Sequence, residues 1–148
     1  MKHLSTTFVL ALLALFVGKG PTCFAKEPNE WVKANMKPLA KLYLHLHKNP
    51  ELSFEEEETA QRIAKEIADV GATITAGVGG FGFVGIIENG EGPTVMLRAD
   101  MEGLPVTEQT NQPYASKKVV TDADGKKVGV MHACGHDIHM TTLVGTAR

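Results

Sequence analysis

Nine residues near the carboxyl end of the chain hold a dense group of chemically reactive side chains. The segment Met131–His139 (MHACGHDIH) contains three of the six histidines and one of the two cysteines. Cys134 and His136 flank Gly135, and in an extended backbone the side chains of residues two positions apart leave on the same side. A thiolate and an imidazole that converge in this way suit zinc, manganese or another transition ion. The sequence therefore predicts that Cys134 and His136 bind a metal.

The neighbouring polar residues have more than one interpretation. His132 and His139 either bind the same ion or, as we expect, form hydrogen bonds or line a pocket. Asp137 either caps the following helix or accepts a hydrogen bond that orients His136. Cys134 taken alone would be a small buried apolar residue or a stray thiol. A thiol hydrolase is disfavoured, because no oxyanion-hole signature occurs and a histidine two residues away is poorly placed as its base.

A second charged cluster follows the most apolar candidate strand. Thr94–Ala99 (TVMLRA) predicts a strand in the centre of a sheet, and Asp100 and Glu102 come directly after it. Ligands of open α/β sheets collect beyond the carboxyl ends of strands, so Asp100 and the Cys134 loop should lie near each other. Taken alone, Arg98 and Asp100 would be an ion pair at the end of a strand.

Two helices are expected before this strand. Apolar residues recur at helical spacing over residues 30–47, with Pro38 as a first-turn residue or a kink, so we expect a helix from about Pro38 to Asn49-Pro50. Ser53–Glu56 (SFEE) is typical of a capping box at the start of a second helix, which Gly71 should end. The buried stripe of this second helix is predicted to be Ala60, Ile63, Ala64 and Ile67.

Extended segments and glycine-rich turns fill the middle of the chain. Residues 72–76 and 83–88 are candidate strands on either side of Gly77–Gly82 (GVGGFG). This loop lacks the trailing Lys-Ser/Thr and the following helix of a phosphate loop, so we reject a phosphate-binding role for it. Asn89-Gly90 predicts a hairpin that returns into Thr94–Ala99.

The last part of the chain predicts a hairpin and then a helix. Val119–Met131 should turn at residues 122–125, and a helical pattern then begins at Ile138. Helices followed by a largely apolar strand favour an α/β fold. Because the helical pattern reaches Arg148 without a cap or stop signal, we expect a truncated domain; the alternative is a complete small domain with a frayed last helix.

The amino end of the chain predicts export. Phe8–Val17 (FVLALLALFV) is an apolar block after Lys2, and it is too short for a bilayer span, which needs roughly 20 residues. A basic start, a short apolar block and the small residue Ala25 describe a secretory signal peptide at residues 1–25. Residues 26–148 would then be secreted or periplasmic, with no stable membrane span.

Composition excludes several classes of protein. With 43% apolar residues the chain is not a disordered one. Signal cleavage would leave 13 basic against 17 acidic side chains and no basic stripe, so a nucleic-acid partner is not expected. Cleavage would also remove Cys23, so Cys134 could not form an intramolecular disulfide.

Three motifs occur in order along the chain: Leu46–Ser53 (LHKNPELS), Leu97–Pro105 (LRADMEGLP) and Gly129–Asp137 (GVMHACGHD). Together they resemble the metal-dependent amidohydrolases and metallopeptidases of the aminoacylase, carboxypeptidase and hippurate hydrolase superfamily. The resemblance is closest to the branch of N-acyl-amino-acid amidohydrolases, hippurate hydrolases and auxin-conjugate hydrolases. It implies a three-layer catalytic domain with a mixed sheet flanked by helices, of which residues 26–148 would form the N-terminal part.

The resemblance also implies roles for particular residues. Cys134 and His136 would bind a pair of divalent ions, manganese or zinc, and Asp100 would support the site. Glu102-Gly103 replaces the usual Asp-Ala pair of this branch. Relatives supply the catalytic Glu, a metal-binding Glu, further His ligands and a lid domain later in the chain, so this piece is expected to be inactive alone. The candidates for a supporting layer around the ligands are Asp137, His132, His139 and Glu102.

The implied reaction is hydrolysis of the amide bond of an N-acyl amino acid or a similar small amide. Two ions about 3.5 to 4 Å apart polarise the carbonyl and lower the pKa of a bound water to near 7. A glutamate then moves the proton to the leaving amine. The resemblance also suggests a homodimer of the complete protein. The alternative is a non-catalytic metal-binding or interaction module left by truncation.

Overall fold

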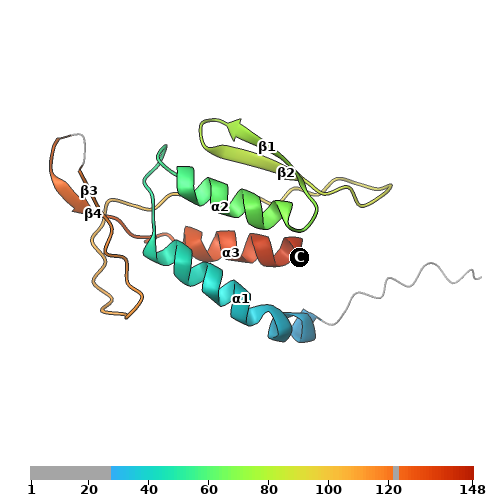
Figure 1. The fold of residues 1–148 in the computed structure, drawn as a ribbon, viewed down its shortest axis with the longest axis horizontal. Helices are drawn as coiled ribbons and strands as arrows, with labels where there is room; N and C mark the ends of the chain where they lie inside the picture. Colours follow the sequence, from blue (N-terminus) through green and yellow to red (C-terminus); the bar gives the residue numbers. More distant parts are fainter. Residues whose placement is uncertain (1–27, 122–123) are drawn as a thin grey trace, which may run out of the picture.

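The computed structural model describes residues 28–121 and 124–148, which form three helices and two β-hairpins. The helices are α1 (Pro28–Lys48), α2 (Glu57–Ala68) and α3 (His136–Ala147), and the strands are β1 (Thr73–Val78), β2 (Gly82–Ile86), β3 (Val119–Thr121) and β4 (Lys127–Gly129). Helix α3 lies between α1 and α2 and contacts both (Figure 1). The predicted α/β class is confirmed, whereas the predicted signal peptide lies outside the described residues.

One end of this helical layer gathers the parts of the chain that carry the motifs. Helix α1 ends there, and α2 and α3 both begin there (Figure 1). The β3–β4 hairpin extends beyond this end, while the β1–β2 hairpin covers the side of α2 that faces away from α3 (Figure 1). The first and third motifs therefore lie at the same end of the molecule.

A single apolar core holds the three helices together. Its buried members come in pairs from α1, α2 and α3: Leu42 and Leu46, Ile63 and Ile67, Met140 and Val144. Each is at most 5% exposed, and complete burial of such a side chain contributes about 1.5–3 kcal/mol. Three residues of the predicted stripe on α2 are buried, and Ala64 is half-buried.

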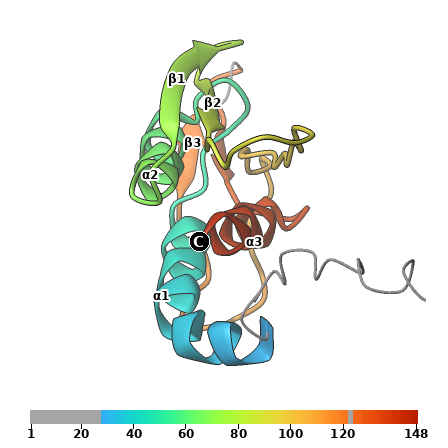
Figure 2. The same cartoon turned by 90° about the vertical axis from the view of Figure 1, so that its right-hand side faces the viewer.

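Helix α1 begins ten residues before the predicted start at Pro38. The proline lies inside the helix, where its ring removes one backbone N–H and favours a bend. Figure 2 shows the first part of the helix, in blue, running across the direction of the second part, in cyan. Pro38 is therefore the kink of a longer helix, which ends at Lys48 just before the predicted Asn49-Pro50.

The predicted capping box at Ser53–Glu56 is wrong. Ser53 lies in a turn, and helix α2 begins without a side-chain cap from Glu56. The carboxylate of Glu51 takes this role, because it accepts the backbone N–H groups of Glu58 at 3.2 Å and Thr59 at 2.7 Å. The cap therefore comes from the loop before the turn, and it ties the end of the first motif to the start of α2.

The predicted strand at Thr94–Ala99 and its hairpin at Asn89-Gly90 do not form. A strand requires hydrogen-bond partners along its edge. Within residues 28–121 and 124–148 the structure contains two ladders of two strands each, and neither includes this segment. The side chains of Val95 and Met96 are 79% and 85% exposed, so these apolar residues lie outside the core.

The predicted hairpin over Val119–Met131 does form, and the two candidate strands around the glycine-rich loop pair with each other to form another. Strands β1 and β2 pair antiparallel across the glycine-rich turn, with a register shift between Ala76 and Val78. Gly79 and Gly80 have φ values of 66° and 111°, which side chains other than glycine rarely adopt. Strands β3 and β4 also pair antiparallel, and two residues of their predicted turn, 122 and 123, lie outside the described part of the chain.

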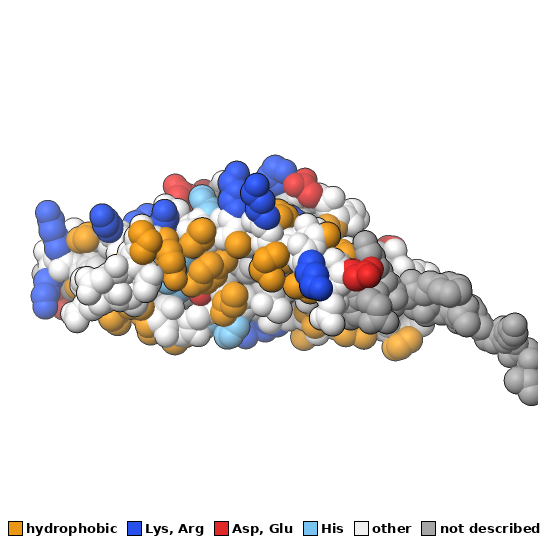
Figure 3. Space-filling view, turned by 90° about the horizontal axis from the view of Figure 1, so that it is seen from below, with side chains coloured by type: hydrophobic (Ala, Val, Ile, Leu, Met, Phe, Trp, Pro, Cys, Tyr) orange, Lys and Arg blue, Asp and Glu red, His pale blue; other side chains and the backbone are white. Residues whose placement is uncertain are grey.

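An apolar groove runs between α1 and α3. Figure 3 shows hydrophobic side chains gathered on the face seen from below, where α1 lies. The groove has a volume of about 470 Å³, and its lining includes Trp31, Met36 and Ile138. Among the described helices, none has the length and apolar character that a membrane crossing requires.

We expect Glu51→Gln to lower the free energy of unfolding by about 1–2 kcal/mol, because an amide offers only one oxygen to the two N–H groups at the start of α2. Ser53→Ala should change it by less than about 0.5 kcal/mol. Denaturant unfolding of both variants tests this. Glu55→Gln is the matched control, since it removes a charge beside the same helix from an exposed residue. A larger loss in Ser53→Ala than in Glu51→Gln would restore the capping box.

Candidate metal centre

The three sequence motifs meet at a junction of short backbone contacts. Leu52 forms a parallel bridge with Gly103, and Leu104 forms an antiparallel bridge with Met131. The N–H of Gly103 donates to the carbonyl of Glu51 at 2.6 Å, and Leu104 and Met131 exchange hydrogen bonds of 2.8 and 3.1 Å. Segments separated by about fifty and thirty residues in the sequence are thereby held side by side.

Gly103 allows this close approach. A Cβ atom at position 103 would lie 2.9 Å from the Cβ of Pro50 and 3.1 Å from Cγ1 of Val130. Real Cβ atoms are rarely so close to other carbons, and Pro50 and Val130 are both buried. Gly103 departs from the usual sequence pattern of the branch, and the close contacts at the junction give a steric reason for a glycine here.

The loop that carries Cys134 is a turn and not an extended segment. The N–H of Ala133 donates to the carbonyl of Met131 at 3.0 Å, and that of Gly135 donates to His132 at 3.1 Å. Gly135 has φ 78° and precedes the first turn of α3. The extended geometry assumed for Cys134 and His136 is therefore wrong, because the left-handed glycine between them turns the chain into a helix.

His136 is oriented by Glu102. The Nδ1 atom of His136 lies 2.9 Å from the backbone carbonyl of Glu102 and 3.4 Å from its carboxylate Oε2. A ring that donates from Nδ1 presents the lone pair of Nε2 to an ion. The Cys134 thiol is exposed. The two candidate ligands thus lie on an accessible loop, and the acceptor expected from Asp137 is provided by Glu102.

His132 lies behind this loop with no hydrogen-bond partner. It is 5% exposed, and both ring nitrogens are unpaired among the described residues. Burial lowers the pKa of His132, and the nearby carboxylate of Asp137 opposes this shift. An unpaired buried polar group costs about 1–3 kcal/mol, so these nitrogens fit a site with a further polar group or ion.

The remaining candidates lie at the edge of the site. The His139 ring is exposed, its centroid is 5.8 Å from that of His136, and it lines a cavity of about 390 Å³ with Leu97 and Arg98. Asp100 forms an ion pair with Arg98. The structure therefore places Asp100 in the interaction that the sequence offered as the simpler alternative.

The donor set fits part of a metal centre. A thiol, an oriented imidazole and a buried imidazole without partners suit a transition ion. However, among residues 28–121 and 124–148 no three His, Cys, Asp or Glu side chains are grouped so that they could hold an ion. The described residues therefore offer ligands but not a closed coordination shell.

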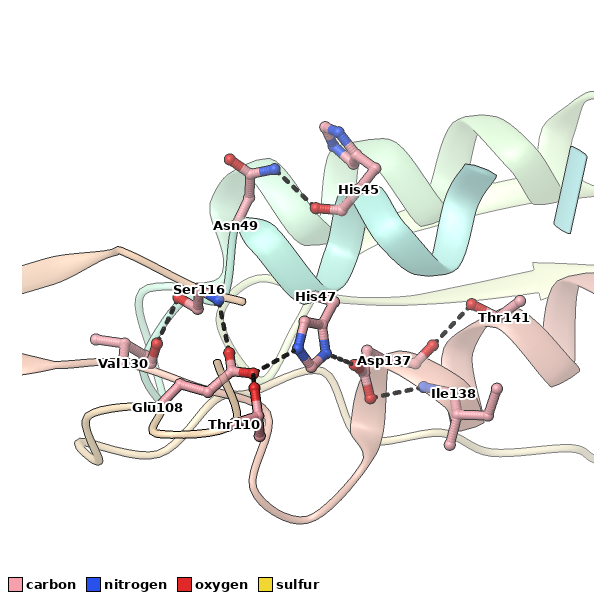
Figure 4. Close-up of polar contacts among 10 residues, drawn as sticks. All are labelled: His45, His47, Asn49, Glu108, Thr110, Ser116, Val130, Asp137, Ile138 and Thr141. Atoms are coloured by element: carbon pink, nitrogen blue, oxygen red, sulfur yellow. Dashed lines mark hydrogen bonds and ion pairs between the residues drawn. The ribbon is translucent and has the colours of Figure 1, made fainter. Parts of the chain in front are cut away.

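Asp137 and two residues that the sequence analysis missed form a buried network beside the loop. The carboxylate Oδ2 of Asp137 lies 2.7 Å from Nδ1 of His47, and Nε2 of His47 lies 3.2 Å from Oε1 of Glu108 (Figure 4). The side chains of Asp137 and Glu108 are 4% and 0% exposed. Asp137 thus bonds the ring of His47 at the end of α1 and not the ring of His136.

Further hydrogen bonds hold both carboxylates in place. Glu108 accepts the backbone N–H of Ser116 at 2.6 Å and the hydroxyl of Thr110. The other oxygen of Asp137 accepts the N–H of Ile138 at 2.8 Å (Figure 4). His47 therefore joins the end of α1, the loop before β3 and the start of α3.

The two carboxylates determine the charge of His47. Burial lowers its pKa, but the hydrogen bonds to Asp137 and Glu108 outweigh this effect and raise the pKa above the usual 6.5. Burial raises the pKa of Glu108, but its bonds to Thr110, Ser116 and His47 lower it below 4.5. A positively charged ring between two negative groups is the state that these contacts favour.

This network could not be predicted from the sequence. His47 lies within the LHKNPELS motif, but its position at the polar end of an amphipathic helix gave no sign of its partners. Glu108 is an isolated acid in a polar stretch. Their contacts join positions 61 and 90 residues apart, which no local pattern encodes.

Residues 96–148 match the family described as Peptidase family M20/M25/M40. The chain is 40% identical to the hippurate hydrolase of Campylobacter jejuni, covering 73% of this chain and 26% of that protein. It is 44% identical to the N-acetyl-L-cysteine deacetylase of Bacillus subtilis, covering 75% of this chain and 25% of that protein. Both alignments reach well beyond the residues that the family model matches.

The fold agrees with these relationships. The Bacillus subtilis YXEP protein, a dinuclear metal-binding peptidase of the M20 family, superposes with a TM-score of 0.65 at 38% identity. The superposition covers 78% of this chain and 30% of that chain. The chain spans about a quarter to a third of the length of the first curated relatives that it matches. The resemblance drawn from the three motifs is thus confirmed.

The His47 network predicts how stability depends on pH. Because folding raises the pKa of His47, its contribution is complete below the unfolded value of 6.5 and is lost as the pH rises through the folded value. Folding lowers the pKa of Glu108, whose contribution is present above 4.5 and is lost as the pH falls through the folded value. Both contributions are therefore complete between about pH 4.5 and pH 6.5, the unfolded pKa values of Glu108 and His47.

We therefore expect the stability difference between the unmodified protein and His47→Gln to shrink as the pH rises from about 6 to about 9. Denaturant unfolding at a series of pH values measures this difference. Ile63→Val, a change in the apolar core, is the control and should give a difference independent of pH. A His47→Gln difference that stays constant over this range would show that the ring is not charged in the folded protein.

Proposed function

Since the chain is related in sequence and in fold to peptidase family M20/M25/M40, we propose that it supplies part of a two-metal centre that hydrolyses an amide bond. The observation that carries this proposal is the junction at Gly103, which places Glu102 against His136 at the start of α3. A core scaffold, an oriented imidazole and an exposed thiol are thereby brought to one end of the molecule.

Cys134 and His136 would hold the ions, and when bound the ions would polarise the amide carbonyl and acidify a water molecule. Glu102 keeps Nε2 of His136 available by accepting a hydrogen bond from Nδ1. Cys134 must lose its proton to bind, and its exposure gives that proton a path to solvent. Asp100 is proposed to support the site from the end of the segment that carries Arg98.

The substrate class is proposed from the relatives. Hippurate, N-acetyl-cysteine and indoleacetyl amino acids, the compounds named for the relatives, are all amino acids acylated on nitrogen. We therefore infer a small N-acyl amino acid or a similar amide, with manganese or zinc as the metal. Because the described residues group fewer than three ligands, the remaining ligands and the proton-transferring base would come from other parts of the gene product, and the chain alone would be inactive.

Location is a separate proposal. The apolar block at residues 8–17, with Ala25 after it, supports a signal peptide at residues 1–25 and a secreted or periplasmic protein. Residues 26–148 would then form the N-terminal part of the catalytic domain.

For the gene product that contains this chain, we expect Cys134→Ala and His136→Ala each to remove bound metal and amide hydrolysis together. Metal content after dialysis and amino-acid release from hippurate and N-acetyl-cysteine, with manganese or zinc added, measure both effects. Asp124→Ala, on the β3–β4 turn away from the loop, is the matched control and should leave both unchanged.

Asp137→Asn should lower metal affinity less than either ligand variant, by about 10-fold to 100-fold, since Asp137 is not a ligand itself but holds the first turn of α3 next to His136 through its bonds to His47 and Ile138. If Cys134→Ala and His136→Ala both retain full metal content and turnover, the ligand assignment fails. Metal binding without turnover of any N-acyl amino acid would instead favour a binding module.

N-terminal sequencing of the exported protein tests the signal peptide. We expect the mature chain to begin near Lys26, because cleavage follows a small residue. Disruption of the apolar block by Leu12→Arg should keep the protein in the cytoplasm, while Lys33→Ala, in the exposed part of α1, should not affect export. Recovery of intact Met1 in the soluble cytoplasm would contradict the proposal.

A further inference from the structure

His47 occupies a position that neither the reaction nor the apolar core explains. Its ring is placed between two carboxylates that come from separate segments of the chain, Glu108 and Asp137 (Figure 4). Tyr43 and Tyr114 flank it, with ring centroids at 5.5 and 5.4 Å. The aromatic rings pack against the imidazole, and each of its nitrogens faces one carboxylate.

The contact with Asp137 acts on the loop that carries the candidate ligands. Asp137 follows His136 directly, and both of its carboxylate oxygens are engaged, one by His47 and the other by the N–H of Ile138. Its backbone carbonyl accepts the hydroxyl of Thr141 at 2.8 Å. The residue next to the candidate ligand is therefore fixed by side-chain and backbone bonds, of which only the bond to His47 comes from outside α3.

A buried polar cluster of this kind is costly to desolvate, and well-packed apolar residues of similar size would often stabilise a fold equally well. In some proteins such clusters are retained because they fix one arrangement among several. Here the arrangement is the direction in which the first turn of α3 leaves the Cys134 turn. The opposite side of the same loop is fixed by Glu102 on His136.

We propose that His47 is a positioning residue of the metal centre, which acts through its hydrogen bond to Asp137 to hold the Cys134–His136 loop in the geometry that binds the ion. This inference rests on the proposed function. The bond to Asp137 reaches the loop directly from the end of α1, whereas the bond to Glu108 reaches only the segment before β3. Loss of the bond to Asp137 should therefore weaken metal binding, whereas loss of the bond to Glu108 should affect stability alone.

Two variants separate these roles. His47→Asn places a side-chain N–H near the position of Nδ1 and can keep the bond to Asp137, whereas His47→Gln places it near Nε2 and can keep the bond to Glu108. Both variants lose one bond and the charge. A merely structural role predicts the same metal affinity for both, while positioning predicts that only His47→Gln binds metal weakly.

The experiment uses the gene product that contains this chain and cobalt(II) as the probe metal. Thiolate ligation by Cys134 gives cobalt a charge-transfer absorption in the near ultraviolet, which reports binding without turnover. We expect His47→Gln to lower cobalt affinity about 10-fold to 100-fold, as for other residues that orient ligands. His47→Asn should stay close to the unmodified protein, and so should the core control Ile63→Val.

Amide hydrogen exchange of the metal-free protein gives a second measure. The N–H of Ile138 donates to Asp137 Oδ1 and lies 3.1 Å from the carbonyl of Gly135. Its exchange should be faster in His47→Gln than in His47→Asn when both are compared at equal global stability. This outcome would support positioning through Asp137 before any metal binds.

The outcomes separate the two proposals. If the unmodified protein shows no thiolate absorption with cobalt, the metal centre and the role of His47 are both overturned. If it binds cobalt through Cys134 but the Asn and Gln variants have equal affinity and equal exchange at Ile138, the positioning role fails and the proposed function stands.

Discussion

The hydrogen bond between His47 and Asp137 is the contact on which the geometry of the candidate site depends. It joins the end of α1 to the first turn of α3 across 90 residues of sequence, and both side chains are almost completely buried. In a medium from which water is excluded, an unpaired carboxylate would be strongly unfavourable, so each group requires the other. The helices pack through apolar side chains, but this pair determines where the ends of the two helices meet.

Steric fit at Gly103 has a complementary effect. The apolar core sets the distance between the helices, whereas the junction at Gly103 sets how closely the three motif segments approach beyond the helix ends. Glu51 contributes to both, because its carbonyl binds Gly103 and its carboxylate caps α2. One short loop after α1 therefore serves the packing of α2 and the alignment of Glu102 with His136.

The candidate ligand residues become more exposed to solvent from the core outward. His132 is buried, with ring nitrogens that have no partner among the described residues; His136 is half-buried and bonded to Glu102, and Cys134 is exposed. This order leads from the fixed interior to the surface at which a substrate would arrive. A metal ligand benefits from this arrangement, since its ring is held from behind while its free nitrogen remains accessible.

The features that could be predicted from sequence are those that depend on neighbours in the chain. The periodicity of α2 and α3, the extended segments at β1 and β2, the β3–β4 hairpin and the three motifs follow from local spacing and turn chemistry, and the motifs were sufficient to identify the family.

Contacts between positions that are distant in the sequence depend on the tertiary structure. Ser53 has the sequence pattern of a helix cap, but the carboxylate of Glu51 accepts the backbone N–H groups at the start of α2, because the chain turns back before the helix begins. Thr94–Ala99 has the composition of a central strand, but a strand forms only where a second strand supplies hydrogen bonds. Asp137 was expected to orient His136, but in the fold its carboxylate bonds His47. A buried carboxylate must bond a donor that lies near it in space, and the sequence alone does not show which donor that is.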